Sequence, residues 1–230
     1  NTLLNKQFGT KELSGFGVDK TPYGLAAAGC LFQYVKDSQR TELPHIRSII
    51  AESSNTGVIL DAATRRNLEL TQNLQGGLEN TLASILDKSS TPMGSRLLKR
   101  WLHFPLRNIE QLECRQQTIT DLIAHDLQLE LTSLLKPLGD IERIVARIAL
   151  RSARPRDFSR LRNALQQLPD MQSTLNETNT AMLKAYAQNA QPLPEMQHLL
   201  EQSIVENPPV LIRDGGVIAP GYNQELDRLR

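Results

Sequence analysis

Aromatic side chains and net charge are both scarce in this sequence. Phe, Trp and Tyr make up 4% of the 230 residues, and the single Trp is Trp101. The 26 Lys and Arg residues are balanced by 25 Asp and Glu residues, so the formal net charge is +1. So small a charge favours neither nucleic acid nor a membrane surface as partner. Leu, Ala, Gln and Arg are abundant instead, and this composition predicts a helical protein.

Cysteine and long apolar runs are also missing. Cys30 and Cys114 are the only cysteines, far apart and without the spacing of metal ligands. We interpret them as reduced, mostly buried thiols in a cytoplasmic protein. We find no signal-peptide pattern and no apolar run long enough to cross a bilayer, so we expect no membrane partner.

The residues needed for catalysis are absent as well. No glycine is followed by lysine, which excludes the phosphate-cradling G-x-x-x-x-G-K-[ST] loop. The four histidines are scattered, and none has a carboxylate or cysteine at ligand spacing: His45, His103, His125 and His198. No nucleophile lies in a pattern with a base. We therefore expect no catalytic, nucleotide-binding or metal site and no cofactor in this chain, which is not itself an enzyme.

The most informative stretch is residues 91–108, TPMGSRLLKRWLHFPLRN. Thr91 is a plausible N-cap, Pro92 suits the first helical position, and Pro105 predicts the end of the helix. Helical spacing places Met93, Leu97, Leu98, Trp101 and Leu102 on one side and Arg96, Lys99, Arg100 and His103 on the other. We expect a helix that packs on its apolar side and faces acidic or polar partners on its basic side.

The remaining elements are predicted to be helical, with one exception. Residues 46–61 read as a β-hairpin with a turn at Ser-Asn-Thr-Gly. Asp61 and Asn108 are possible N-caps, and Gln111 suits the third position after Asn108. Predicted helices cover residues 23–39, the stretch after Asp61, 78–86, the stretch from 109, 127–136, 140–151, the stretch from 155, 171–186, 193–205 and the stretch from 223. An extended segment with a turn at 214–216 precedes the last of them.

Several long runs of this sequence resemble the MutS family of DNA mismatch-repair proteins, in its bacterial form. The runs are LDAATRRNLEL at 60–70, LDKSSTPMG at 86–94, TPMGSRLLKRWLHFPL at 91–106, IERIVARIALRSARPRDFSRLR at 141–162 and PPVLIRDGGVIAPGYNQELDRLR at 208–230. The resemblance implies a mainly α fold. Residues 1–45 would be the end of the connector domain, a small α/β remnant. Residues 46–230 would be the first part of the helical core, or lever, domain, with the short β-hairpin at the junction.

The resemblance also implies what the intact protein does. Family members recognise mismatched double-stranded DNA, bind and hydrolyse ATP with Mg²⁺, form homodimers and signal to MutL. The mismatch-reading, clamp and ATPase domains would lie outside this chain, which we expect to be an excised fragment of a cytoplasmic, nucleoid-associated protein. The role implied for the fragment is structural: a stiff helical body that relays movement between the ATPase and DNA-binding domains.

Two groups of charged residues are candidates for sites. Arg143, Arg147 and Arg151 follow one another at i, i+4 spacing, and this stripe could track DNA phosphates. It lacks interleaved aromatic residues, and nearby carboxylates offer pairing within the chain, so a solvated or interdomain face is the favoured interpretation. A second group is assigned to interdomain contacts: Asp61, Arg65, Arg66, Arg100 and His103. Asp61 and Arg65, at i, i+4, can also support their own helix.

Three other functions stay open. The chain could be a stand-alone nucleic-acid-binding module that uses the basic stripe of residues 143–162, or a helical adaptor unrelated to repair. It could also come from a MutS paralogue that acts in recombination. If the elements that complete the core are absent, apolar surface should be exposed, and we then expect the chain to self-associate.

Overall fold

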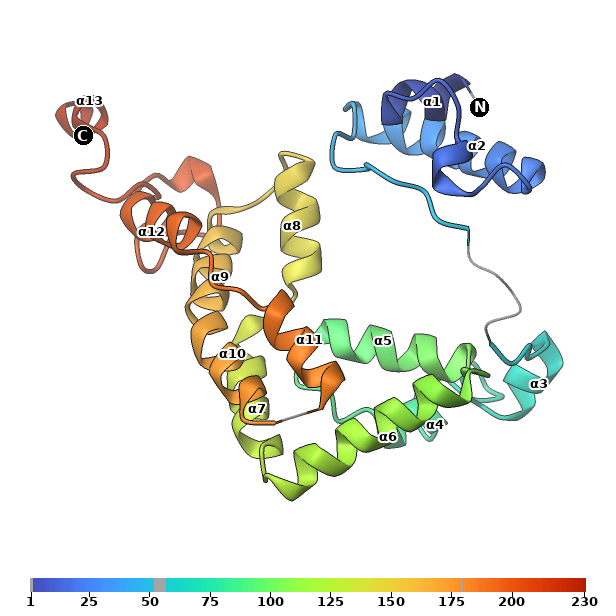
Figure 1. The fold of residues 1–230 in the computed structure, drawn as a ribbon. Helices are drawn as coiled ribbons and strands as arrows, with labels where there is room; N and C mark the ends of the chain where they lie inside the picture. The colour runs from blue at the N-terminus through green and yellow to red at the C-terminus, as the bar shows by residue number, and fades with distance from the viewer. Residues whose placement is uncertain (1, 52–56, 179) are drawn as a thin grey trace. The chain divides into compact units, whose positions relative to one another are not determined.

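The computed structural model describes residues 2–51, 57–178 and 180–230. The chain divides into two compact units: the first unit, residues 1–54 and 145–153, and the second unit, residues 55–144 and 154–230. Both units are built from helices, so the prediction of a mainly α fold is confirmed (Figure 1). Among the described residues, no helix is both long and apolar enough to span a membrane.

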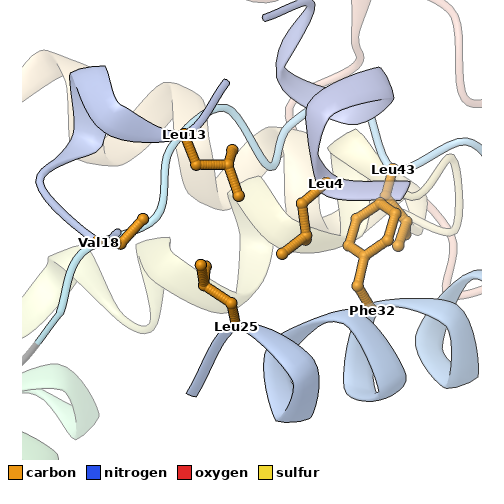
Figure 2. Close-up of a cluster of buried hydrophobic side chains, with 6 residues drawn as sticks. All are labelled: Leu4, Leu13, Val18, Leu25, Phe32 and Leu43. Carbon is orange, nitrogen blue, oxygen red and sulfur yellow. The ribbon is translucent and has the colours of Figure 1, made fainter. Parts of the chain in front are cut away.

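The first unit is organised around one apolar cluster. Helix α1 (Thr2–Phe8) and helix α2 (Pro22–Gln39) supply three of its six buried side chains, and the other three come from the segments around a 3-10 turn (Ser14–Phe16) and after α2. Figure 2 shows the six buried side chains converging between these elements: Leu4, Leu13, Val18, Leu25, Phe32 and Leu43. Leu43 has no exposed surface, and Gln7 fixes its segment by donating to the Leu43 carbonyl at 2.9 Å.

The expected α/β character of residues 1–45 is wrong for the part that the structure describes, where helices and turns are present without a strand. The glycine-rich segment 13–18 does not extend into a strand. It closes into a 3-10 turn that ends at Gly17, whose φ of 67° is a left-handed conformation that glycine adopts at low cost.

The predicted hairpin over residues 46–61 is not confirmed. Its turn falls within residues 52–56, outside the described part of the chain. Before the turn, residues 46–51 have no regular structure. After it, Gly57 forms an isolated antiparallel bridge with Leu106. Val58 N–H donates to the Pro105 carbonyl at 2.7 Å. A side chain at Gly57 would meet that carbonyl at 3.2 Å, so glycine permits the close approach.

The second unit begins with three capped helices, α3 (Ala62–Asn67), α4 (Leu82–Leu86) and α5 (Pro92–His103). The predicted caps Asp61 and Thr91 accept from Thr64 N–H at 2.6 Å and Gly94 N–H at 3.1 Å. Helix α4 starts later than predicted, because Thr81 is the cap and forms reciprocal bonds with Ser84.

Ten further helical segments complete the described chain. They are α6 (Ile109–Ala124), α7 (Gln128–Leu135), η3 (Lys136–Leu138), α8 (Ile141–Ala149), α9 (Pro155–Gln166), α10 (Leu168–Asn176), α11 (Ala181–Asn189), α12 (Pro194–Ser203), η4 (Ile212–Asp214) and α13 (Gln224–Leu229). As predicted, Asn108 caps α6 by accepting from Gln111 N–H at 2.9 Å. Helices α6, α7, α10 and α11 share an apolar cluster around Leu175 and Leu183, and α9 packs on α12 (Figure 1).

The helix predicted over residues 171–186 is wrong, because the chain forms α10 and α11 there instead. The interruption contains Thr178, which is fully buried and donates its hydroxyl to the Leu175 carbonyl at 3.2 Å. Threonine hydroxyls that bond nearby backbone compete with helical hydrogen bonds. Thr180 then adopts an extended conformation as the residue before α11.

Candidate functional site

The basic side of α5 forms the best-defined polar site of the molecule. The Arg96 guanidinium binds Asp140 in a bidentate manner, with Nη1 donating to Oδ2 and Nη2 to Oδ1, both at 2.8 Å. The same Nη2 lies 2.5 Å from Glu142 Oε2. Because Asp140 immediately precedes α8 and accepts from Arg143 N–H at 3.3 Å, this contact fastens the first turn of α8 to the middle of α5.

The charges at this site reinforce one another. Hydrogen bonds from Arg96 hold the pKa of the Asp140 carboxyl at about 2, against an ordinary value of 3.8, and Asp140 in turn raises the pKa of Arg96. The Asp140 side chain is only 18% exposed. The pair therefore stays ionised at neutral pH, and its planar two-bond geometry fixes the orientation of both groups.

The opposite side of α5 is less covered than the sequence predicts. Leu97 is 47% exposed and Trp101 is 41% exposed, and no residue of the helix is buried. The Arg115 guanidinium from α6 lies 3.8 Å from the centroid of the Trp101 ring. This cation–π contact takes the place of the apolar packing that the pattern predicts.

Two of the residues assigned to interdomain contacts, Arg65 and His103, make contacts at the end of α5, and a third, Asp61, lies at the start of α3. Asp61 caps α3, and its hydrogen bond with Thr64 N–H lowers its pKa. The Arg65 guanidinium lies 5.3 Å from the centroid of the Phe104 ring, next to His103 in the chain. His103 Nε2 lies 3.1 Å from Thr71 Oγ1. These contacts all join parts of the second unit.

The last two members of that set are Arg66 and Arg100. Arg66 is exposed on α3, and Arg100 lies in the last turn of α5. The positive charge of Arg100 is favourable there, because the carbonyl end of a helix carries partial negative charge.

The predicted DNA-binding stripe is only partly present as a continuous face. Arg143 and Arg147 lie on α8, whereas Arg151 follows the end of that helix with a left-handed φ of 55°. The chain turns there because Arg151 N–H donates to the Ile148 carbonyl and Ser152 N–H to the Arg147 carbonyl. Arg143 Nε also lies 3.4 Å from Asp140 Oδ2, which partly neutralises its charge.

Sequence reasoning missed the roles of two arginines. Arg96 appears in the sequence only as one of several basic residues on α5, and its partner Asp140 lies 44 residues away. Arg162 belongs to the basic series but is 7% exposed, and it donates to the Ile204 and Glu206 carbonyls, both at 3.1 Å. In the sequence, such a long-range contact can be suspected only where an arginine lies on the apolar side of a predicted helix. This pattern identifies Arg162, but it does not identify the carbonyls to which Arg162 donates.

These contacts connect helices and bring no reactive groups together. Within the described ranges, no group of three or more His, Cys, Asp or Glu side chains is arranged to hold a metal ion. The described residues form a helical assembly in which polar contacts join segments far apart in sequence.

Comparison with protein families extends this description. The model of MutS domain III matches residues 63–229, and the model of MutS domain II matches residues 1–47. The first match alone covers more than half of the chain. The chain belongs to the MutS family of DNA mismatch-repair proteins, and the parts that it matches are domains II and III of that family.

Proposed function

We propose that this chain is a transmission element of a MutS-family mismatch-repair protein, relaying conformational change between its ATPase and DNA-binding domains. The bidentate ion pair between Arg96 and Asp140 is the observation that supports this role most directly. It joins α5 to the start of α8 through two parallel hydrogen bonds of 2.8 Å. Movement of one helix is thereby passed to the other as a rigid displacement, since the bidentate pair resists both sliding and rotation.

The rest of the proposal concerns the intact protein. Residues 1–45 would form the end of its connector domain, and residues 46–230 the first part of its lever domain. Its partners would be mismatched double-stranded DNA, a second copy of itself and MutL, and its cofactors would be ATP and Mg²⁺ bound outside this chain. We place it in the bacterial cytoplasm, associated with the nucleoid.

The test is an Arg96→Gln variant of the intact protein. We expect mismatch binding and basal ATP hydrolysis close to those of the unmodified protein. The difference in ATPase rate between a G·T heteroduplex and the matched homoduplex should fall about fivefold or more, the size of a modest coupling free energy. Asp140→Asn should have a similar effect, and the double variant should lose little beyond either single one, because all three remove the same contact.

Lys99→Gln is the matched control, since Lys99 is an exposed cation on the same helix. This variant should keep its full response to the mismatch. A normal response of the Arg96→Gln protein would contradict the proposal. So would loss of DNA binding and of ATPase coupling in equal measure, because that pattern indicates general damage to the fold.

The alternative is a stand-alone nucleic-acid-binding module that uses the stripe of residues 143–162. The exposed part of Arg143, whose side chain is 69% accessible, is the observation in its favour. Fluorescence anisotropy of this chain with heteroduplex and homoduplex DNA across a salt series separates the two functions. A transmission element should bind both duplexes weakly and equally. Tight binding with a steep salt dependence would favour the module instead.

A further inference from the structure

Exposed aromatic side chains and cations meet at the end of α5. Leu97 is 47% exposed, Trp101 is 41% exposed and Phe104 is 55% exposed. Arg100 is exposed as well, and the four residues follow one another at i, i+3, i+4 and i+7, a spacing that places them along one side of a helix. We name these four residues the α5 patch. Phe104 directly follows the last residue of α5, so the patch extends from the middle of the helix to its carboxyl end.

An arginine from another segment is paired with each ring of the α5 patch. The Arg115 guanidinium from α6 lies 3.8 Å from the centroid of the Trp101 ring, and the Arg65 guanidinium from α3 lies 5.3 Å from the centroid of the Phe104 ring. Both rings keep much of their surface in solvent despite these contacts. Exposed rings that alternate with cations are the arrangement on which proteins stack the bases of unpaired strands while they bind the phosphates.

The segment that contains the α5 patch is strongly basic. Residues 88–109 include no Asp or Glu, and their cations are Lys88, Arg96, Lys99, Arg100 and Arg107. Asp140 neutralises Arg96, whereas Lys99 and Arg107 are exposed. A local excess of positive charge attracts an anionic partner, although the chain as a whole is almost neutral.

The carboxylates that flank this segment face away from the α5 patch. Asp87 accepts a hydrogen bond from the Ser95 hydroxyl near the start of α5, at the other end of the helix. Helical spacing places Glu110 and Glu113 on the opposite side of α6 from Arg115. These carboxylates therefore do not cancel the positive charge of Arg115 beside the Trp101 ring.

We propose that the α5 patch binds single-stranded nucleic acid, with bases stacked on Trp101 and Phe104 and phosphates bound by the arginines beside the two rings. An acidic peptide would match the charge but would leave the rings unused. The inference is independent of the transmission function, because it uses the side of α5 opposite Arg96. Two stacked bases and a few phosphate contacts give weak binding, with a dissociation constant on the order of 100 µM at about 50 mM salt.

Fluorescence of Trp101 reports on this site directly, because it is the only tryptophan of the chain. Titration with an oligothymidylate of about 12 nucleotides should quench the fluorescence to saturation. A duplex of the same length should quench it much less, since its bases are stacked on one another. Raising the salt concentration from about 50 to 200 mM should weaken binding roughly tenfold, as expected for the release of two or three phosphate contacts.

Substitution of the rings separates stacking from charge. Phe104→Leu keeps an apolar side chain but removes one ring, and it should weaken binding of the oligothymidylate at least about fivefold. Trp101→Leu should have a similar effect, measured by anisotropy of a labelled oligothymidylate. Tyr186→Leu is the matched control: Tyr186 is 52% exposed on α11, outside the α5 patch, and its replacement should leave binding unchanged. Far-UV circular dichroism checks that each variant is folded.

Three results would overturn the proposal. The first is the absence of saturable quenching up to about 1 mM oligothymidylate. The second is a duplex that quenches as strongly as the single strand, or binding that both ring variants retain in full, because either result assigns the affinity to phosphate contacts alone. The third is equal competition by an oligoglutamate of the same charge, which would assign the α5 patch to an acidic protein segment. None of these results affects the outcome expected for Arg96→Gln in the intact protein.

Discussion

The two units of this chain achieve stability in different ways. The first unit has a cluster of six buried apolar side chains, all from residues 4–43, and Leu150 packs against it. In the second unit, apolar burial is divided along a succession of helices, and arginine pairs such as Arg96 with Asp140 join segments far apart in sequence. The comparison teaches that one fold can combine a unit built around a single apolar cluster with a unit in which distributed apolar burial is supplemented by helix caps and long-range polar contacts.

The largest expected effect comes from the apolar cluster of the first unit. Leu43→Ala should lower the free energy of unfolding of that unit by about 2–5 kcal/mol, because it removes a fully buried side chain and leaves a cavity. Urea unfolding followed by far-UV circular dichroism measures the loss. Trp101, the only tryptophan, lies in the second unit, so its fluorescence transition should not move. Leu31→Ala, at an exposed position of α2, is the control.

The next effect concerns the second unit. Arg162→Met should cost about 2–3 kcal/mol, because it leaves the carbonyls of residues 204–206 without their buried donor. Hydrogen exchange should accelerate at the amides of Val205 and Ala219, which donate to the Val217 and Ser203 carbonyls and so join residues 203–205 to residues 217–219. Arg160→Met alters an exposed arginine of the same helix. It should change neither the free energy of unfolding nor the exchange rates of these amides. A neutral Arg162→Met would show that the hydrogen bonds of Arg162 add nothing to the apolar packing of this unit.

The third prediction concerns the dependence of stability on pH at the ion pair between Asp140 and Arg96. Asp140 has a pKa of about 2 in the folded chain and an ordinary value of 3.8 when unfolded. Its contribution, at most about 2 kcal/mol, is complete above pH 4 and is lost as the pH falls toward 2, because the unfolded state takes up the proton first. The difference in stability between the unmodified chain and Asp140→Asn should therefore shrink over this range in acid titrations of Trp101 fluorescence. A constant difference would exclude the carboxylate as its source.

The smallest effect belongs to a helix cap. Thr91→Ala removes the acceptor for Gly94 N–H and should destabilise α5 by about 1 kcal/mol. Thr91→Ser keeps an oxygen at the same position and should cost a few tenths at most. Trp101 lies on α5, so its fluorescence during urea unfolding measures both variants. Equal losses for serine and alanine would mean that the threonine methyl group, not the cap, matters.

Local features of this fold could be predicted from sequence, and distant ones could not. Thr91 with Pro92, and Asn108 with Gln111, predicted the starts of α5 and α6 because a cap and its helix are neighbours in the chain. The break between α10 and α11 was missed; Thr178, which lies in it, is fully buried, and tertiary packing overrides local helix propensity. The pairing of Arg96 with Asp140 joins two segments 44 residues apart, and no local pattern specifies which acidic residue an arginine meets.

The candidate site residues show the same division. The i, i+4 spacing correctly placed Arg143 and Arg147 on one helix, but it carried the stripe on to Arg151, beyond the residue at which the chain turns. The assignment of Arg65 and His103 to interdomain contacts stays a prediction. Their contacts with Phe104 and Thr71 belong to the second unit itself.

The buried position of Arg162 has a consequence for synthesis. Its acceptor carbonyls belong to residues that follow it by 42–44 positions. On the ribosome, α9 emerges while those residues are still inside the exit tunnel, and the guanidinium stays hydrated until they follow. The order of translation thus imposes an order of assembly, in which α9 forms before the segment after α12 docks onto it. A pause in translation before residue 206 would therefore leave the Arg162 guanidinium without its acceptor carbonyls.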